Sequence, residues 1–187
     1  VPGSHVGIHT HNDTENAVAN SLAAVRAGAR QIQGTLNGLG ERCGNANMTS
    51  IIPTLLLKSE FANYFETGIT PEKLRTLTHA SRVLDEVLNQ APDRHAPYVG
   101  ESAFATKAGI HASAILKEPE TYEHVRPEAV GNERRLLVSK QAGRSNVLSA
   151  LERFGLAQDR DDDRITRLLD EVKAREAAGY SYEAAEA

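Results

Sequence analysis

The feature of this 187-residue sequence that most constrains its fold is a strand-to-helix unit that occurs twice near its start. Residues 6–9 form a short apolar run that predicts a buried strand, and apolar side chains at helical spacing then predict a helix over about residues 15–27. Residues 30–33 predict a second strand, and a glycine-rich loop over 34–44 separates it from a helix over about 46–58. Two such units in succession predict parallel strands joined by helical crossovers, and therefore an α/β sheet or barrel.

The remainder of the chain carries helical patterns and no further strand signal. Thr70 and Pro71 are typical of a helix start. Alternating steps of three and four then predict one amphipathic helix over residues 70–88, through Leu74, Leu77, Ser81, Leu84 and Leu88. Later helices are predicted over residues 102–116, 144–154 and 161–178. The consecutive aspartates 161–163 are expected to cap the last of these helices, because negative charge is favourable at a helix N-terminus.

Composition excludes several classes of function. The chain has 21 Lys and Arg against 25 Asp and Glu, so its net charge of -4 offers no excess of cations for nucleic acid or an anionic membrane surface. Its longest apolar run, residues 51–57, is far shorter than the ~20 residues that cross a bilayer. The single cysteine, Cys43, excludes an internal disulfide and favours the cytoplasm. Because the sequence begins at Val1 with a strand almost at once, we expect a piece of a longer protein.

A His-x-His pair lies at the end of the first predicted strand. His9 and His11 point the same way on extended backbone, so two imidazoles can reach one metal ion. Such pairs also occur by chance, but this one closes a predicted parallel strand, where the active sites of α/β folds gather. Asp13 either adds a carboxylate or caps the following helix, and we favour the cap.

The glycine-rich loop follows the second predicted strand and should open at the same end. Asn45, just after it, offers an amide oxygen of the kind that hard cations accept. The glycine spacing departs from the dinucleotide-binding fingerprint, and the charged Glu41 and Arg42 stand where phosphates would lie. We expect these two charges to pair with each other or with barrel neighbours, and Cys43 to be a packed, inert thiol.

The helical half contains histidines with less context. His111 lies beside a glycine, and Tyr122 and His124 lie in a turn region, where each is open to a structural or a functional interpretation.

These segments together resemble the isopropylmalate, citramalate and homocitrate synthase family of metal-dependent TIM-barrel acyltransferases. The motifs that carry the resemblance are residues 9–13 (HTHND), 33–47 (QGTLNGLGERCGNAN) and 109–111 (GIH). The amino-acid sequences of residues 97–105, 121–124 and 131–135 resemble those of the citramalate synthase branch of this family. The resemblance implies the last two strand-helix units of a (β/α)8 barrel over residues 1–92, a first linker subdomain over 93–130 and a helical subdomain over 131–187.

The resemblance also implies chemistry. His9, His11 and Asn45 would ligate a divalent cation, with magnesium, manganese and zinc left open. Acetyl-CoA would condense with a 2-oxo acid, pyruvate giving citramalate, as a step of isoleucine or leucine biosynthesis. His111 and Tyr122 match a catalytic linker His and Tyr that approach the active site of the partner subunit and assist proton transfer or water activation there. The resemblance therefore also implies a homodimer.

Departures from the family leave alternatives. Glu15 and Thr106 stand where many members carry Gly and His, and the barrel segments that supply an aspartate ligand, an arginine and a catalytic glutamate are not in this sequence. We therefore expect the 187 residues alone to be inactive, since two strands cannot close a barrel. A metal-dependent hydrolase is disfavoured because Thr14 stands where its signature needs a histidine, and a non-catalytic helical interaction module is the other alternative.

Overall fold

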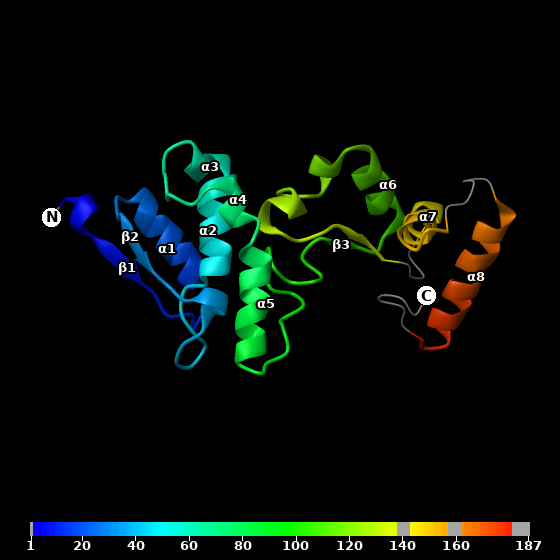
Figure 1. Ribbon diagram of the computed structural model, residues 1–187, viewed down its shortest axis with the longest axis horizontal. Helices are drawn as coiled ribbons and strands as arrows, with labels where there is room; N and C mark the ends of the chain where they lie inside the picture. Colours follow the sequence, from blue (N-terminus) through cyan, green and yellow to red (C-terminus); the bar gives the residue numbers. More distant parts are fainter. Residues whose placement is uncertain (1, 138–142, 157–161, 181–187) are drawn as a thin grey trace. The chain divides into compact units, whose positions relative to one another are not determined.

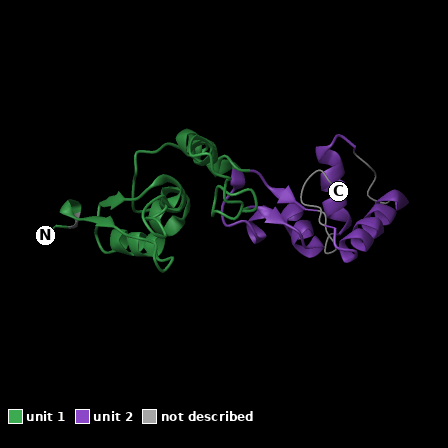
Figure 2. Ribbon diagram, turned by 90° about the horizontal axis from the view of Figure 1, so that it is seen from below, with its two compact units in different colours: residues 1–103, 128–132 green, residues 104–127, 133–187 purple. Residues whose placement is uncertain are grey.

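The computed structural model describes residues 2–137, 143–156 and 162–180. The chain divides into two compact units, residues 1–103 with 128–132 and residues 104–127 with 133–187 (Figure 2). The three-part division at residues 92 and 130 stays a prediction about domains. Among the described residues, no helix is long and apolar enough to cross a membrane.

The first unit contains both predicted strand-to-helix units. Strands β1 and β2 are parallel neighbours (Figure 1). Ile8 lies opposite Ile32 in their register. This pairing confirms the parallel strands and helical crossovers expected from the sequence pattern. The helices and strands of this unit are β1 (Gly7–His9), α1 (Ala17–Arg26), β2 (Gln31–Gln33), α2 (Met48–Leu57), α3 (Ser59–Ala62), α4 (Pro71–Leu74) and α5 (Leu77–Val87), with 3-10 turns η1 (Gly3–His5), η2 (Leu36–Gly38) and η4 (Pro127–Val130).

The core of the first unit lies where α1 and α2 pack against β2. Ile51 of α2 is fully buried, and Ile32 of β2 packs against the same cluster. Asn47 caps α2, because its side chain accepts hydrogen bonds from both the backbone N–H and the hydroxyl of Thr49, at 2.9 and 2.7 Å. The fully or nearly buried members of the cluster are Ala17, Val25, Ala46, Ile51, Leu55 and Phe61.

The expectation of one helix over residues 70–88 is wrong, because the structure has two helices there, α4 and α5. Thr70 caps α4 as predicted, accepting from the Lys73 N–H at 3.4 Å, but α4 ends at Leu74. The backbone of Gly131 passes so close to the break that a Cβ there would lie 2.0 Å from the Arg75 carbonyl oxygen. A tertiary contact therefore overrides the helical periodicity at this point.

The second unit holds a short parallel ladder that the sequence analysis missed. Strand β3 (Ala105–Thr106) pairs with β4 (Arg135–Leu136), so the expectation that strands cease after residue 58 is wrong. The helix predicted over 102–116 begins only at Gly109, as α6 (Gly109–Lys117), because the residues before it enter this ladder. A 3-10 turn, η3 (Pro119–Thr121), follows it.

Two helices complete the second unit, close to their predicted positions. They are α7 (Arg144–Arg153) and α8 (Asp163–Ala177). The side chain of Asp162 caps α8 by accepting from the Arg164 N–H at 2.8 Å, which confirms the cap expected from the aspartate run; Asp161 lies outside the described residues. The buried residues Val147, Ile165, Leu169 and Val172 form the core between these helices.

Candidate functional site

The two predicted imidazole ligands lie together at the carboxyl end of β1. His9 is the last residue of the strand and His11 lies two residues beyond it, with ring centroids 5.0 Å apart and ring planes 79° apart. Both side chains are exposed, so neither ring is packed into the core. The structure thus leaves two imidazoles side by side and open to a ligand, at the end of a parallel strand.

Asn45 lies directly opposite His11. The two residues form an isolated antiparallel bridge, and flanking backbone hydrogen bonds join the segments: Asn12 N–H to the Gly44 carbonyl at 2.8 Å and Ala46 N–H to the Thr10 carbonyl at 3.0 Å. This bridge brings all three sequence-predicted metal ligands into one region of the first unit.

The amide oxygen of Asn45 is a buried acceptor for which the described residues provide no hydrogen-bond partner. The amide nitrogen of the same side chain donates to the Leu39 carbonyl at 3.1 Å, which leaves the oxygen as the open end. An unsatisfied buried polar atom is costly unless something binds it, and an amide oxygen is a good ligand for a hard cation. The donor set therefore fits a divalent cation.

The described residues contain no group of three His, Cys, Asp or Glu side chains arranged as a metal site. The candidate set is thus two imidazoles and one amide oxygen. Such a set is partial, because a divalent cation takes four or more ligands.

Glycines shape the loop that holds Asn45. Gly44 has φ of +88°, and a Cβ there would lie only 2.0 Å from the carbonyl oxygen of Gly38. The same Gly38 carbonyl accepts from the Asn45 N–H at 3.0 Å. A Cβ at Gly40 would lie 2.5 Å from the Asn45 amide nitrogen. These close approaches explain why a glycine-rich stretch precedes the candidate ligand.

An ion pair between Arg42 and Asp13, a partner that the sequence did not identify, joins the two loops of the site. Arg42 donates to both carboxylate oxygens of Asp13, at 2.7 and 2.9 Å, and this hydrogen bonding holds the pKa of Asp13 below its usual value. Arg42 and Glu41 are also within 3.8 Å, as the predicted pairing required. The expectation that Asp13 caps α1 is wrong, because Asn12 Oδ1 accepts from the Ala17 N–H, at 3.3 Å, while the Asp13 carboxylate is paired with Arg42.

A hydrogen-bond cluster ties the glycine-rich loop to α5. Asn37, which has φ of +56°, donates to the Ser81 carbonyl at 3.0 Å and to Asp85 Oδ1 at 2.8 Å, and Ser81 Oγ donates to its amide oxygen at 2.7 Å. These partners lie more than forty positions away in the chain, so no local spacing could reveal them. The cluster anchors the first part of the glycine-rich loop, and Asn45 directly follows this loop.

Cys43 departs from its predicted environment. We expected a packed thiol, but Cys43 is exposed.

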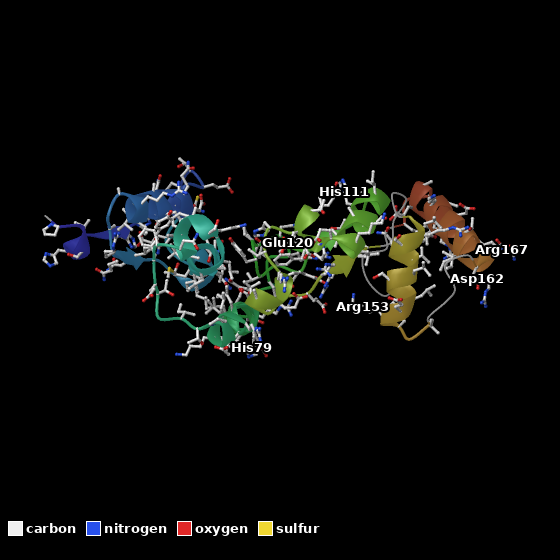
Figure 3. All side chains as sticks on the ribbon, turned by 90° about the horizontal axis from the view of Figure 1, so that it is seen from above. His79, His111, Glu120, Arg153, Asp162 and Arg167 are labelled. Atoms are coloured by element: carbon white, nitrogen blue, oxygen red, sulfur yellow. The ribbon has the colours of Figure 1, made fainter. Side chains whose placement is uncertain are left out.

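His111 and Tyr122 lie together in the second unit. Their ring centroids are 4.5 Å apart with the planes inclined by 36°, and His111 lies on α6 (Figure 3). Tyr122 follows η3 and is 51% exposed. Next to it, Glu123 pairs with Arg134, and His124 stacks on Phe104 with ring centroids 5.8 Å apart. The structure brings the two predicted catalytic side chains into ring contact.

Comparison with known proteins decides the family. An HMGL-like family model matches residues 1–80, and the homocitrate synthase post-HMGL domain-like model matches residues 98–179. The chain is 56% identical to the (R)-citramalate synthase of Synechocystis sp. over 182 residues, which is 97% of this chain and 32% of that protein. The chain belongs to the citramalate, isopropylmalate and homocitrate synthase family.

Further relatives include another citramalate synthase and a homocitrate synthase. The (R)-citramalate synthase of Aquifex aeolicus is 53% identical over 184 residues, 98% of this chain and 34% of that protein. The homocitrate synthase of Pyrococcus abyssi is 38% identical over 172 residues, 92% of this chain and 45% of that protein. The chain spans about a third of the length of the citramalate synthases that it matches.

Proposed function

We propose that this chain is part of a cytoplasmic acyltransferase that condenses acetyl-CoA with a 2-oxo acid, with pyruvate as the oxo acid and citramalate as the product. The citramalate synthases that it matches at 53–56% identity support this choice over homocitrate synthase, at 38%. The product would enter the synthesis of isoleucine or leucine. Neither a metal-dependent hydrolase nor an interaction module is favoured by these relatives.

The two strand-to-helix units of the first unit have a proposed position in the complete barrel. The units β1–α1 and β2–α2 would be the last two of a (β/α)8 barrel, which places the polar ends of both strands at its catalytic face. Residues 1–92 would then complete the barrel domain, with a linker subdomain over 93–130 and a helical subdomain over 131–187. The unpaired outer edges of a two-stranded sheet would be covered by the other strands.

The observation that carries the proposal is the open amide oxygen of Asn45 opposite His11. His9, His11 and Asn45 would hold a divalent cation, magnesium, manganese or zinc, with the remaining ligands from elsewhere in the longer protein and from substrate. When bound, such a cation supplies Lewis-acid stabilisation of the negative charge that develops on the keto oxygen. Asp13 and Arg42 would keep the two ligand-bearing loops in register through their bidentate pair.

His111 and Tyr122 would transfer protons during the reaction or activate a water molecule. An imidazole nitrogen and a phenol hydroxyl are both able to hold and release a proton at a reacting carbonyl or a water molecule. Tyr122 is 51% exposed and His111 is partly exposed beside it, so a second molecule can reach the pair, and we propose that both serve the active site of the partner subunit in a homodimer.

The test uses the longer protein that contains this chain. Thiol release from acetyl-CoA is measured with pyruvate, 2-oxoisovalerate and 2-oxoglutarate, and pyruvate should give the highest kcat/KM. In parallel, Mn²⁺ binding is measured by electron paramagnetic resonance, which does not depend on turnover.

Variants H9A, H11A and N45A should each weaken Mn²⁺ binding by about tenfold or more. The matched control is H79A, which removes an exposed imidazole on α5 (Figure 3). Unchanged Mn²⁺ affinity in all three site variants would contradict the metal assignment, and thiol release with none of the three acids would contradict the reaction. The 187 residues alone should form no citramalate above the blank.

A further inference from the structure

We propose that the ion pair between Glu123 and Arg134 is a positioning device that holds the Tyr122 ring against His111; the catalytic consequence of this inference rests on the proposed function. Its members lie in two separate sequence motifs, residues 121–124 and 131–135, and are 11 positions apart, so the sequence alone did not pair them.

The geometry of the pair is that of a rigid clamp. Arg134 donates through Nε to one carboxylate oxygen of Glu123 and through Nη2 to the other, the second bond being 2.7 Å long. The Glu123 side chain is only 7% exposed and the Arg134 side chain 29%. A two-point contact between a planar guanidinium and a carboxylate fixes orientation as well as distance, and burial shields it from solvent.

The ring of Tyr122 lies at the surface of the second unit. Half of the side chain is exposed, and its backbone is bonded through the 3-10 turn, with its N–H donating to the Pro119 carbonyl at 3.2 Å. The Glu123 N–H donates to the same carbonyl at 3.0 Å. Because Glu123 is the next residue, anchoring its buried carboxylate anchors the end of the turn on which the exposed ring lies.

Arg134, the other member of the ion pair, is connected to His111 through the β3–β4 ladder. Arg134 comes directly before β4, whose residue Arg135 donates its N–H to the Phe104 carbonyl at 3.1 Å, at the entry to β3. Strand β3 ends three residues before α6, the helix that carries His111. The β3–β4 ladder thus links the segment that carries Arg134 to the segment that leads into α6 and His111. The ion pair between Arg134 and Glu123 then links the same segment to Tyr122.

Removing one partner should therefore release the ring rather than only weaken the fold. Loss of the two-point contact leaves the Glu123 side chain free to change orientation, and the adjacent Tyr122 ring is then no longer held against His111. In E123Q the carboxylate charge is lost while the side-chain volume is kept. In R134K the positive charge is kept while the two-point fork is lost.

The experiment combines kinetics with a probe of ring position. In the longer protein that contains this chain, 3-fluorotyrosine is placed at position 122, and the change in its ¹⁹F resonance on adding H111A measures the contact between the rings. This change should be clear in the otherwise unaltered protein and largely lost in E123Q and R134K. In the same two variants kcat should fall by about tenfold or more, with the KM of pyruvate nearly unchanged.

The control is E120Q, which changes an exposed glutamate on the same turn (Figure 3). It should leave both kcat and the ¹⁹F response as they are. If E123Q does not fold, R134K alone carries the test. An undiminished ¹⁹F response in the folded clamp variants would overturn the proposal. If the clamp variants lose the ¹⁹F response but the parent protein condenses no 2-oxo acid, the positioning role stands and the proposed function fails.

Discussion

The loop glycine Gly44 offers the sharpest test of how the backbone places Asn45. In G44A, the new Cβ would lie 2.0 Å from the Gly38 carbonyl oxygen, whereas an ordinary contact is 3.4–4 Å. The backbone has to move by more than an ångström to relieve this overlap. The residue that moves is the acceptor for the Asn45 N–H, so relief of the overlap displaces the candidate ligand.

The size of the effect follows from two contributions. The left-handed conformation at φ of +88° costs a non-glycine residue about 1–2 kcal/mol, and loss of the hydrogen bond from Asn45 to Gly38 costs about 1 kcal/mol. The sum is about 2–3 kcal/mol, which corresponds to Mn²⁺ binding roughly thirty- to a hundredfold weaker if the loop must return to its original geometry to bind.

The assay is Mn²⁺ titration followed by paramagnetic resonance, with chemical denaturation of the same samples. Gly68 provides a matched control, because its φ is +71° but a Cβ there would meet no atom within 4 Å. G68A should therefore carry the conformational cost alone and bind Mn²⁺ normally. Equal Mn²⁺ affinity in G44A and G68A would refute the claim that the Gly38–Gly44 contact places the ligand.

Three further predictions concern stability. Because Ile51 is fully buried in the core of the first unit, I51A should lower the free energy of unfolding by about 3 kcal/mol in urea denaturation, and a loss near zero would contradict the packing described. N47A should cost about 1 kcal/mol in the same measurement, because it removes the two hydrogen bonds that cap α2. Hydrogen bonds from the Arg164 side chain and backbone lower the pKa of Asp162 from its ordinary value of 3.8, so the stabilisation is present above pH 3.8 and is lost as the pH falls through the lowered pKa. Acid titration followed by circular dichroism should show that D162N removes this part of the pH dependence, and an identical acid transition in the variant would show that the pair contributes nothing.

Local signals explain what the sequence predicted well. The run before His9 and the helical spacing after it lie within a few residues of each other, and the parallel order of β1 and β2 follows from the crossover that α1 must make. The capping residues Thr70 and Asp162 act within three positions, so their helix starts were predictable.

Long-range contacts explain what the sequence did not predict. Strands β3 and β4 have two residues each and gain their ladder from partners far apart in the chain, which leaves no alternation to detect. The break between α4 and α5 lies where Gly131 approaches Arg75, from more than fifty-five positions later in the chain. In both cases a tertiary contact overrides a local pattern.

The candidate site divides in the same way. The resemblance of the motifs pointed to His9 with His11 and to His111 with Tyr122. The structure places the two rings of each pair in contact. The pairing of Asp13 with Arg42, 29 positions away, and of Glu123 with Arg134 had no spacing signal, because ion pairs between segments depend on the folded backbone. The supporting interactions around the site were therefore visible only in the structure.

The most direct measurement of the central claim is anomalous diffraction from crystals of the longer protein grown with Mn²⁺. We expect one strong anomalous peak within about 2.4 Å of an imidazole nitrogen of His9, an imidazole nitrogen of His11 and the amide oxygen of Asn45. A peak bound elsewhere, or one in contact with neither imidazole while the Asn45 oxygen stays without a ligand, would contradict the account.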